Sequence, residues 1–380
     1  MSQFLQVYLK RILSSTDNDF VDNYDSDRFG PEVLEKKSIK QRISRLLEKA
    51  GIVTTGARAL AVNQAKRTIC SGLEFVEPHL ADLDWLYSNL ADEESRQALV
   101  DVLAFRALGY RKIKLPTNCQ AHWDNLKIAE KLADGCEQID SGFNRWKLTK
   151  MNLLTLGYPI EIYFSPAGVV IDFMEQQYRC DTPEGTIECT EGDYVIDAGG
   201  CWGDTALYFA HKAGNNGKVY SFEFLPDNLK IYDKNLSLNP LLSPRIKRIE
   251  NPLWSCGGEE VAISAYGPGS SIVPEASAST PNLLRFQSAA IDDLVENGGI
   301  EKVNFIKMDI EGAELQALKG SEQTIRRFKP KLTITVYHDL KDFWEIPEWI
   351  NNLDLGYKFY LRHFTIHAEE TVLYAKASYS

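Results

Sequence analysis

The residues with the clearest chemical meaning lie in a glycine-rich stretch near the middle of the chain. Residues 194–196 are apolar, Asp197 follows them, and the glycines Gly199, Gly200 and Gly203 come next. Glycine lets the backbone turn tightly and approach a ligand, because it has no Cβ atom. The amphipathic run that follows predicts a helix whose free N–H groups face that ligand. The stretch therefore predicts a strand, a ligand-binding turn and a helix.

A second acidic residue stands at the end of the next predicted strand. Residues 218–222 predict this strand, and Glu223 closes it. A carboxylate at this distance from the glycine turn suits a ribose diol, since it accepts two hydroxyl hydrogen bonds. The two segments together predict a site for a nucleoside cofactor.

The residue that ends the first strand indicates which cofactor this is. The dinucleotide fingerprint is Gly-x-Gly-x-x-Gly and usually has a neutral residue at that place. Here Asp197 leads into Ala-Gly-Gly-Cys-Trp-Gly. An acidic group suits the cationic methionine part of S-adenosylmethionine (SAM) and repels a pyrophosphate. We expect SAM as the cofactor, and the alternatives are a dinucleotide-dependent oxidoreductase and a tight turn without a ligand.

Five further residues are candidates for contact with the cofactor. Cys201 and Thr205 belong to the turn and to the start of the helix. Asn251 and Trp254 follow the predicted third strand, near the usual place of adenine, so the Trp254 ring either stacks on the base or belongs to the core. Tyr178 precedes the first strand and either covers the methionine end of the cofactor or packs as an ordinary aromatic residue.

Residues able to move a proton stand at the ends of two later strands. Asp309 closes a predicted strand at 303–309, and His338 closes another at 331–338. In open α/β sheets, ligands bind beyond the carboxyl ends of the strands. Methylation of an alcohol requires loss of its proton, and a histidine of near-neutral pKa beside a carboxylate suits that task. We expect His338, which Asp339 follows, to be the general base; a capping or core histidine is the alternative.

Other charged residues surround these two strand ends. Lys307 shares a strand face with Asp309 and is costly in a central strand unless it is paired. It is therefore predicted to form an ion pair with Asp309 or another acid, or to point at the acceptor oxygen as a catalytic group. Asp309, Glu311 and Glu314 together offer oxygen ligands for a divalent cation. Acids at a helix N-terminus also complement the helix dipole without any metal, and we favour that reading.

The wider pattern predicts the elements that position these residues. Strands at 194–197, 218–223, 246–250, 303–309 and 331–338 alternate with helical patterns, such as those at 228–238 and 312–318. This alternation implies a mostly parallel, doubly wound sheet. Two further strands, at 357–361 and 370–375, predict a terminal hairpin. The expected fold is α/β: a Rossmann-like, seven-stranded, mostly parallel sheet with a C-terminal antiparallel hairpin, as in SAM-dependent methyltransferases.

The order of several short blocks resembles the FkbM methyltransferase family. These blocks lie at residues 197–204, 222–226, 291–294, 307–314, 329–330, 338 and 370–374, within a resemblance that runs from about residue 158 to residue 375. The resemblance implies transfer of a methyl group from SAM to a hydroxyl oxygen of a sugar, a glycan or a macrolide natural product. A non-sugar acceptor and a SAM-binding protein without activity are the alternatives. The presence of Asp197, Glu223, Asp309 and His338 favours an active enzyme.

Composition limits the expected partners and location. The net charge of −11 argues against a nucleic-acid acceptor, which normally requires a basic face. No apolar run approaches membrane-spanning length, and the first residues lack the layout of a secretory signal. The seven cysteines are scattered and form no C-x-x-C pair, which indicates reduced thiols. We therefore expect a cytoplasmic protein without a membrane span.

The chain, at 380 residues, is longer than a usual single core, so we expect two domains. Residues 1–156 predict a mainly helical accessory domain that supports homodimerisation or acceptor binding, and residues 157–380 predict the methyltransferase domain. Within the latter, residues 157–178 predict a hairpin that leads into the core. A basic amphipathic helix at 36–49 either contacts an anionic surface or, more commonly for such patterns, forms a solvated face.

Overall fold

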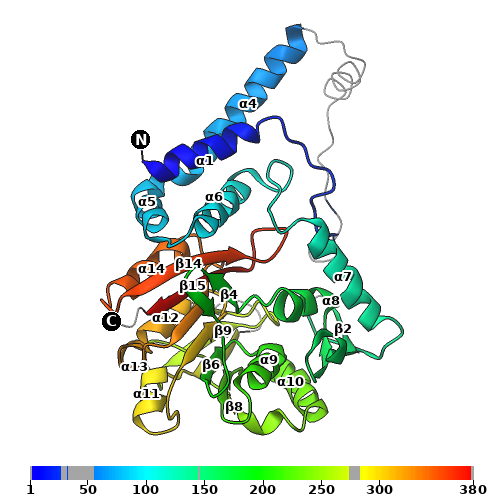
Figure 1. The fold of residues 1–380 in the computed structure, drawn as a ribbon, viewed down its shortest axis with the longest axis vertical. Helices are drawn as coiled ribbons and strands as arrows, with labels where there is room; N and C mark the ends of the chain where they lie inside the picture. Colours follow the sequence, from blue (N-terminus) through cyan, green and yellow to red (C-terminus); the bar gives the residue numbers. More distant parts are fainter. Residues whose placement is uncertain (1, 27–31, 33–54, 144–145, 274–282, 378–380) are drawn as a thin grey trace. The chain divides into compact units, whose positions relative to one another are not determined.

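The computed structural model describes residues 2–26, 32, 55–143, 146–273 and 283–377. The chain forms two compact units: the first comprises Met1–Ser88, Arg96–Asn118 and Thr365–Ala368, and the second comprises Asn89–Ser95, Cys119–Phe364 and Glu369–Ser380 (Figure 1). The division therefore differs from the expected boundary at 156/157, because residues 119–156 group with the second unit. Independent folding of the two units stays a prediction. The expected basic helix at 36–49 lies outside the described residues.

A seven-stranded sheet forms the centre of the second unit, with the strand order β14-β15-β13-β12-β6-β7-β8. The five consecutive strands β13, β12, β6, β7 and β8 run parallel, and β15 runs antiparallel between β13 and β14. The expected fold class, including the terminal antiparallel hairpin, is confirmed. The strands are β6 (Tyr194–Ala198), β7 (Lys218–Phe222), β8 (Ile246–Ile249), β12 (Phe305–Met308), β13 (Lys331–Thr335), β14 (Tyr357–His363) and β15 (Thr371–Ala377).

Helices connect these strands and cover the sheet. A proline at the first helical position starts α10, where the missing N–H costs nothing. Val195, Phe209 and Phe305 are fully buried and belong to one core between the sheet and α9. The helices of this part are α9 (Asp204–Ala213), α10 (Pro226–Leu238), η4 (Ser243–Arg245), α11 (Ile291–Glu296), α12 (Glu314–Lys319), α13 (Glu322–Phe328) and α14 (Asp342–Asn351).

The carboxyl ends of β6 and β12 form the switch point of the sheet. These two strands are neighbours, with Lys307 opposite Asp197 in the register. The chain leaves β6 towards β7 on one side and leaves β12 towards β13 on the other. Ligands of doubly wound sheets bind at such a crevice. The fold therefore brings the glycine turn, Asp309 and the end of β13 to one edge of the sheet.

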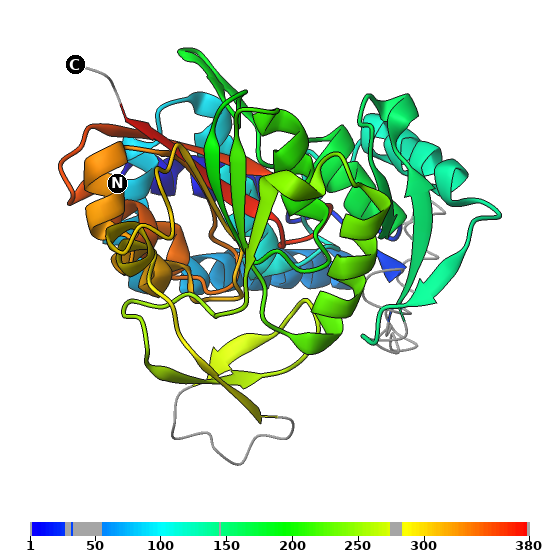
Figure 2. The same cartoon turned by 90° about the horizontal axis from the view of Figure 1, so that it is seen from below.

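Three small sheets accompany the central one. Figure 2 shows the sheet β10-β9-β11 apart from the central strands. A second small sheet, β1-β2-β3, packs with α7 (Gln120–Ala133), and β4 and β5 form a hairpin. The small strands are β1 (Gln138–Asp140), β2 (Lys147–Asn152), β3 (Glu161–Phe164), β4 (Cys180–Thr182), β5 (Gly185–Ile187), β9 (Glu260–Ser264), β10 (Ser271–Val273) and β11 (Leu283–Gln287); η2 (Leu154–Leu156) lies between β2 and β3.

The expected hairpin at 157–178 is wrong. The strand β3 pairs with β2, which precedes it, and the segment that follows is helical: α8 (Pro166–Val169) runs into η3, a π-helix at Val170–Met174. The cause is local, because the Ser165 side chain accepts a hydrogen bond from the Gly168 N–H and Pro166 occupies the first helical position. Both features are helix-start signals.

The first unit contains helices, as expected. In α1 (Gln3–Ser14) the buried Phe4, Tyr8 and Ile12 form one stripe, and the Tyr8 hydroxyl donates to the carbonyl of Gly72 in α4 at 3.0 Å. A Cβ atom at Gly72 would lie 3.0 Å from the Ile12 side chain, so glycine lets the two helices pack closely there. The other helices of this region are α4 (Thr55–Val76), η1 (Glu77–His79), α5 (Leu80–Asn89) and α6 (Glu93–Leu108), the last of which extends across both units.

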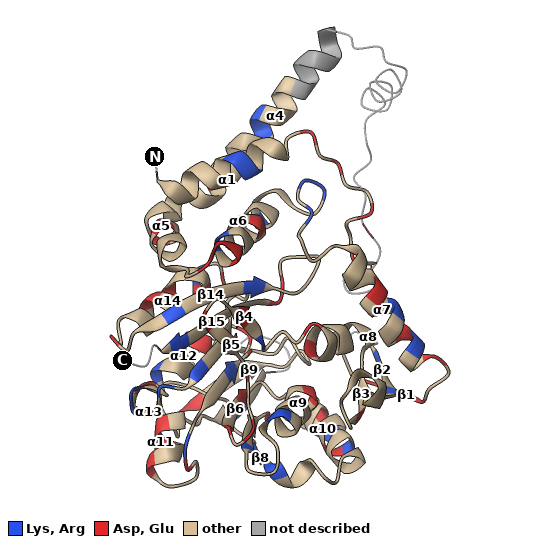
Figure 3. Cartoon of the chain, in the orientation of Figure 1, with Lys and Arg blue, Asp and Glu red and all other residues tan. Residues whose placement is uncertain are grey.

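Charged residues of both signs lie on described helices such as α10 and α13 (Figure 3). Among the described residues, no helix is long and apolar enough to cross a membrane.

Candidate functional site

The glycine turn is shaped by its neighbours within the protein. Gly199 has a φ of +85°, and a Cβ atom there would lie 1.9 Å from the carbonyl oxygen of Asp309. A Cβ atom at Gly200 would lie 2.3 Å from the Ser221 hydroxyl, and Gly203 has a φ of +83° at the start of α9. Glycine is therefore required at this turn by packing and backbone conformation, whether or not a ligand is bound.

Asp197 lies buried beneath this turn. Its Oδ1 accepts a hydrogen bond from the Thr205 hydroxyl at 2.8 Å, and its Oδ2 accepts one from the Ser221 hydroxyl at 2.7 Å. The Lys307 ammonium is 3.4 Å from Oδ1. The side chain of Asp197 has no exposed surface, and its contacts hold the turn in place. The expected contacts of Asp197 and Thr205 with the cofactor stay predictions.

Lys307 connects β12 to the same turn. Its ammonium donates to the carbonyl oxygens of Ala198 and Gly199, at 3.0 and 2.7 Å, and faces Asp197. Burial by itself lowers the pKa of Lys307, but nearby carboxylates, Asp197 foremost, outweigh it and the net pKa is raised. These two hydrogen bonds and the nearby Asp197 carboxylate favour the expected ion pair over a contact with the acceptor. The catalytic role expected for Lys307 stays a prediction.

Glu223 is held by its own loop. Its Oε1 accepts hydrogen bonds from the N–H groups of Phe224 and Leu225, at 2.8 and 2.7 Å, and its Oε2 accepts one from Asn228 at 3.2 Å. Burial raises its pKa to about 7, although these bonds oppose the shift. The Cys201 N–H also bonds this carboxylate, which joins it to the glycine turn. Its predicted hold on a ribose diol is compatible with this place and stays a prediction.

The remaining expected cofactor residues have different surroundings. Burial raises the pKa of the Cys201 thiol well above its usual value, so this thiol is neutral at pH 7. The Asn251 side chain donates to the carbonyl of Gln287, and Trp254 packs on the cluster around Ile263. Contacts of these residues with adenine stay predictions.

Tyr178 is buried next to the catalytic edge of the sheet. Its ring centre lies 5.5 Å from the Lys307 ammonium, and its hydroxyl donates to Asp309 Oδ2 at 3.4 Å. Gln177 donates to the same hydroxyl at 2.6 Å. The ring also packs on Phe209, at 5.8 Å between ring centres, so the core alternative for Tyr178 fits the structure.

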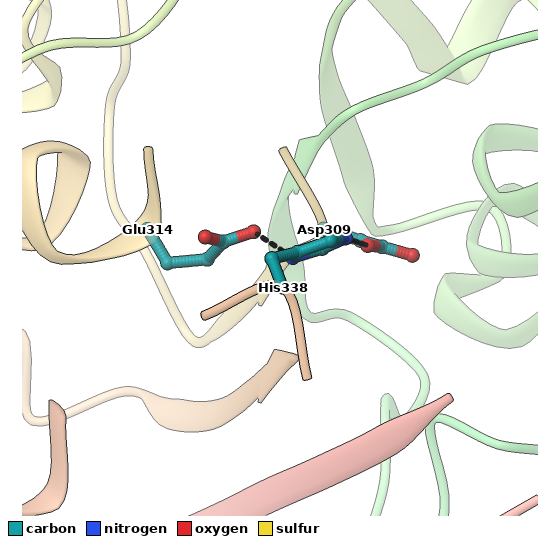
Figure 4. Close-up of side chains that lie close together, drawn as sticks. All are labelled: Asp309, Glu314 and His338. Carbon is teal, nitrogen blue, oxygen red and sulfur yellow. Dashed lines mark ion pairs between the residues drawn. The ribbon is translucent and has the colours of Figure 1, made fainter. Parts of the chain in front are cut away.

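His338 lies between carboxylates that come from the connection between β12 and α12. Its Nδ1 is 3.0 Å from Glu314 Oε1, and its Nε2 is 3.4 Å from Asp309 Oδ1 (Figure 4). Glu311 Oε1 is 3.6 Å from Nε2. The side chain of His338 is 8% exposed and that of Glu314 is fully buried. The expected contact of His338 with an acidic partner is therefore present, although the partner on Nδ1 is Glu314 and not the neighbouring Asp339.

The backbone and two hydroxyl groups hold these acids in place. Glu314 Oε1 accepts the Ile310 N–H at 2.8 Å and the Thr335 hydroxyl at 3.3 Å. Asp309 Oδ1 accepts the Tyr337 hydroxyl at 3.3 Å and lies 3.2 Å from the Thr335 hydroxyl, whose single proton is donated to one acceptor at a time, such as Asp309 or Glu314. The Tyr337 ring also packs against His338, with ring centres 4.1 Å apart. The acids and the imidazole are thus oriented before any ligand binds.

The carboxylates hold the imidazole in its charged form. Burial by itself lowers the pKa of His338, but Glu314, Glu311 and Asp309 outweigh it and raise the pKa well above its ordinary value. Burial likewise raises the pKa of Glu314, but the contact with His338 outweighs it and the net pKa is lowered. Near neutral pH the two groups form an ion pair, and His338 must lose a proton before it can act as a base.

One set of these groups could hold a metal ion. Single ligand atoms of Asp309, Glu314 and His338 lie within 4.8 Å of one another. The two ring nitrogens of His338 face different acids, however: Nδ1 faces Glu314, and Nε2 faces Asp309 and Glu311. If one ring nitrogen of His338 bound a cation, the acid at the other ring nitrogen would not be a ligand and would only hydrogen-bond to the imidazole. The ion pairs of His338 with these acids account for the cluster without a cation, so we favour the interpretation without a metal.

Four residues near the candidate site were not expected from the sequence to contribute in the way that the structure shows. They are Asp172, Asp204, Glu314 as the partner of His338, and Tyr337. Asp204 follows the glycine turn directly, and Tyr337 precedes His338, so their places in the motifs were available as signals. The position of Asp172 could not be predicted, because the segment around it was expected to be a strand and is a π-helix.

Comparisons with known proteins agree with this geometry. The model of the methyltransferase FkbM domain matches residues 189–359. Hexuronic acid methyltransferase AglP of Haloferax volcanii is 28% identical over 140 residues, which are 37% of this chain and 54% of that protein, so the match spans about half the length of this relative. Methyltransferase sdnD of Sordaria araneosa is 24% identical over 190 residues, which are 42% of this chain and 73% of that protein.

Among solved structures, methyltransferase FkbM from Methylobacillus flagellatus KT is 20% identical, with a TM-score of 0.49 over 90% of this chain and 71% of that chain. The family match covers the strands β6, β7, β8, β12 and β13, the glycine turn, Glu223, Asp309 and His338. Residues 189–359 of this chain thus match the methyltransferase FkbM domain, the family that the sequence motifs resemble.

Proposed function

We propose that the protein is a SAM-dependent O-methyltransferase that acts on a hydroxyl group of a sugar, a glycan or a related natural product. The observation that supports the reaction type best is the Glu314–His338 contact, 3.0 Å long, at the carboxyl end of β13. An imidazole whose Nδ1 contacts an acid can take a proton from a hydroxyl group through its other ring nitrogen, Nε2.

The residues at the switch point fit the proposed cofactor. Glu223 is a buried acceptor at the end of β7, the place of a ribose ligand in such sheets. The glycine turn leaves the first N–H groups of α9 without intrahelical partners, and Asp204 adds a buried acceptor oxygen there. When bound, SAM supplies a methyl group on a sulfonium, which an oxygen nucleophile can attack.

The acceptor hydroxyl needs to lose its proton as its oxygen attacks. His338 Nε2 takes this proton, and Glu314 on Nδ1 fixes the ring and stabilises its charged form. Asp309, which three hydroxyl groups hold in place, orients the imidazole or the acceptor from the Nε2 side. Because the ligand-free imidazole is charged, the base acts only in the fraction of molecules that has lost this proton.

A sugar acceptor is supported by the relative whose printed name is hexuronic acid methyltransferase. That name describes the other protein, and its match covers about half of it, so the acceptor class is part of the proposal. The other relative is named only as a methyltransferase and gives no acceptor. A non-sugar acceptor therefore stays the second candidate.

Two assays test this function. In thermal-shift measurements, SAM and S-adenosylhomocysteine (SAH) should raise the melting temperature and NAD should not. Formation of SAH should then be measured with SAM and a panel of monosaccharides, nucleotide sugars, oligosaccharides and non-sugar alcohols. Stabilisation by NAD alone would exclude a SAM enzyme, and turnover confined to the non-sugar alcohols would exclude the sugar class.

A further inference from the structure

Two buried carboxyl groups near the glycine turn lie outside the network of His338. Asp204 is the first residue of α9, and Asp172 lies in the π-helix η3. Their residues are 6% and 7% exposed, and their carboxyl groups hydrogen-bond to each other. Oδ1 of Asp204 is buried and receives no hydrogen bond from an N–H or hydroxyl group of the described residues.

Such a pair is costly in a protein interior without a cation. Two close carboxylates cannot both be ionised easily, so they share a proton. Burial raises the pKa of Asp204 to about 6, and burial together with Asp204 and Glu370 raises that of Asp172 well above its usual value. Lys307 and Asp197 also act on Asp204, in opposite directions. The Lys307 ammonium, which contacts Asp197 and two carbonyl groups, lowers the pKa of both carboxyl groups, but the net pKa of each is still raised, so the charge of the pair is not fully compensated.

The position of the pair suggests its ligand. Asp204 follows the turn that leaves β6, which is paired with β12 at the switch point of the sheet. Asp197, expected to contact the cationic methionine part of the cofactor, is fully buried and already contacts Thr205, Ser221 and Lys307. An ammonium group has three N–H donors, whereas a sulfonium has none, so two carboxyl groups with a free acceptor oxygen suit an ammonium.

We propose that Asp172 and Asp204 together bind the α-ammonium group of the amino-acid part of the cofactor. This inference rests on the proposed function, since it requires SAM or SAH as the ligand. The ammonium donates hydrogen bonds to both carboxylates, and the proton that they share in the ligand-free protein leaves to solvent. Binding at a pH near 6 should therefore release a proton.

The wild-type protein tests this without any mutation. Calorimetry compares SAH with its analogue that lacks the α-amino group, in two buffers of different ionisation enthalpy near pH 6. We expect SAH to bind at least about tenfold more tightly than the analogue. We also expect SAH to release more protons than the analogue, and any proton that Glu223 exchanges is common to both because both keep the ribose.

Variants then locate the effect. Asp204→Asn and Asp172→Asn should each reduce the preference for SAH over the analogue to less than about threefold. Asp227→Asn is the matched control, since Asp227 also lies in the first helical turn, of α10, but is exposed and contacts Lys230. It should keep the wild-type preference.

The outcomes separate the two hypotheses. If the wild-type protein binds neither ligand, the proposed cofactor is wrong. If it binds SAH and the analogue equally well, with equal proton release, the cofactor stands and the ammonium site is overturned. A preference that persists in both aspartate variants also overturns it. If a variant does not fold, the wild-type comparison and its proton count still decide.

Discussion

At the scale of single residues, the protonation state of His338 determines when the proposed base can work. Three carboxylates raise its pKa above the ordinary value, so the imidazole is charged at neutral pH. The rate of methyl transfer should therefore rise as the pH increases through this raised pKa, on the alkaline side of a normal histidine. The pH range in which the rate increases should therefore lie above the near-neutral range expected for an unperturbed histidine.

The variant His338→Gln should reduce turnover by about 10²- to 10⁴-fold, the usual value of a positioned base, and should leave SAH affinity nearly unchanged. The alkaline rise of the rate should disappear. Steady-state kinetics over a pH series, with calorimetry of SAH, measure both effects.

Glu314→Gln is the companion variant. Loss of this carboxylate should lower the pKa of His338, since Glu314 is the largest of the upward influences. The rising limb should move to lower pH, while the maximal rate falls at least about tenfold because the ring is less well oriented. Near-wild-type turnover in His338→Gln would rule out the base. Activity that EDTA abolishes and Mg²⁺ restores would instead indicate a metal at Asp309 and its neighbours.

Glu223 gives a second prediction at this scale. Glu223→Gln should weaken SAH binding by about 1.5–3 kcal/mol, through loss of a charge-assisted hydrogen bond to the ribose. Because the pKa of Glu223 is raised to about 7, its carboxylate form increases as the pH rises through that value. Wild-type affinity for SAH should rise over this range, and the slope should be smaller in Glu223→Gln. Asp227→Asn is the control, and unchanged affinity in Glu223→Gln would remove the ribose assignment.

At the scale of elements, the segments with a strong periodic pattern could be predicted from the sequence. The apolar run before Asp197 and the alternation of strands and helices fit only a doubly wound sheet, and the order found agrees. The segment 166–174 could not be predicted from its apolar residues. Val169, Val170 and Ile171 favour a strand, but the Ser165 cap starts a helix and packing keeps it.

The candidate site was predictable only in part, because its contacts join distant segments. His338 and Asp309 were found from their places at strand ends. The contact between Glu314 and His338 depends on the angle at which α12 leaves β12, and no pattern in the sequence gives that angle. The buried state of Asp197 depends likewise on Ser221 in the neighbouring strand.

The turn after β6 gives a prediction at the scale of elements. Gly199→Ala should destabilise the fold by at least about 3 kcal/mol, because its Cβ would overlap the Asp309 carbonyl. Gly258→Ala is a matched control: its φ of +79° is similar, but no atom lies within 4 Å of the added Cβ. The control should cost about 1 kcal/mol, from backbone strain alone. Urea denaturation measures the free energy of unfolding of both variants. Equal losses in the two variants would show that packing against the Asp309 carbonyl is unimportant.

At the scale of the whole molecule, the grouping of residues 119–156 with the second unit changes the expected effect of truncation. A chain that begins at Cys119 loses Asn89–Ser95 of the second unit but keeps β1, β2 and β3 together with the whole central sheet, and we expect it to bind SAH. A chain that begins at Lys150 loses β1 and the buried Leu148 and Thr149 of β2, so it should be unstable.

Thermal-shift measurements with SAH distinguish the two chains. Stabilisation of the Cys119 chain and not of the Lys150 chain supports the division near residue 119. If the Cys119 chain is insoluble or binds no SAH, the two units depend on each other for folding. Size-exclusion chromatography of the full chain separately tests the expected homodimer.

The π-helix at Val170–Met174 means that the position of Asp172 depends on the number of residues in this segment. Its wide turn is closed by the Glu175 N–H, which donates to the Val170 carbonyl at 2.7 Å, five residues earlier. Deletion of Ile171 would restore ordinary α-helical spacing and rotate the side chains on either side of the cut by about 100° relative to each other. Asp172 would then leave its partner, so we expect the deletion to abolish the preference for SAH over the analogue without an α-amino group, while Ile171→Val keeps it. Homologues that bind the same cofactor in this way should therefore keep the same number of residues here and an acid at the position of Asp172, while the residues around it vary.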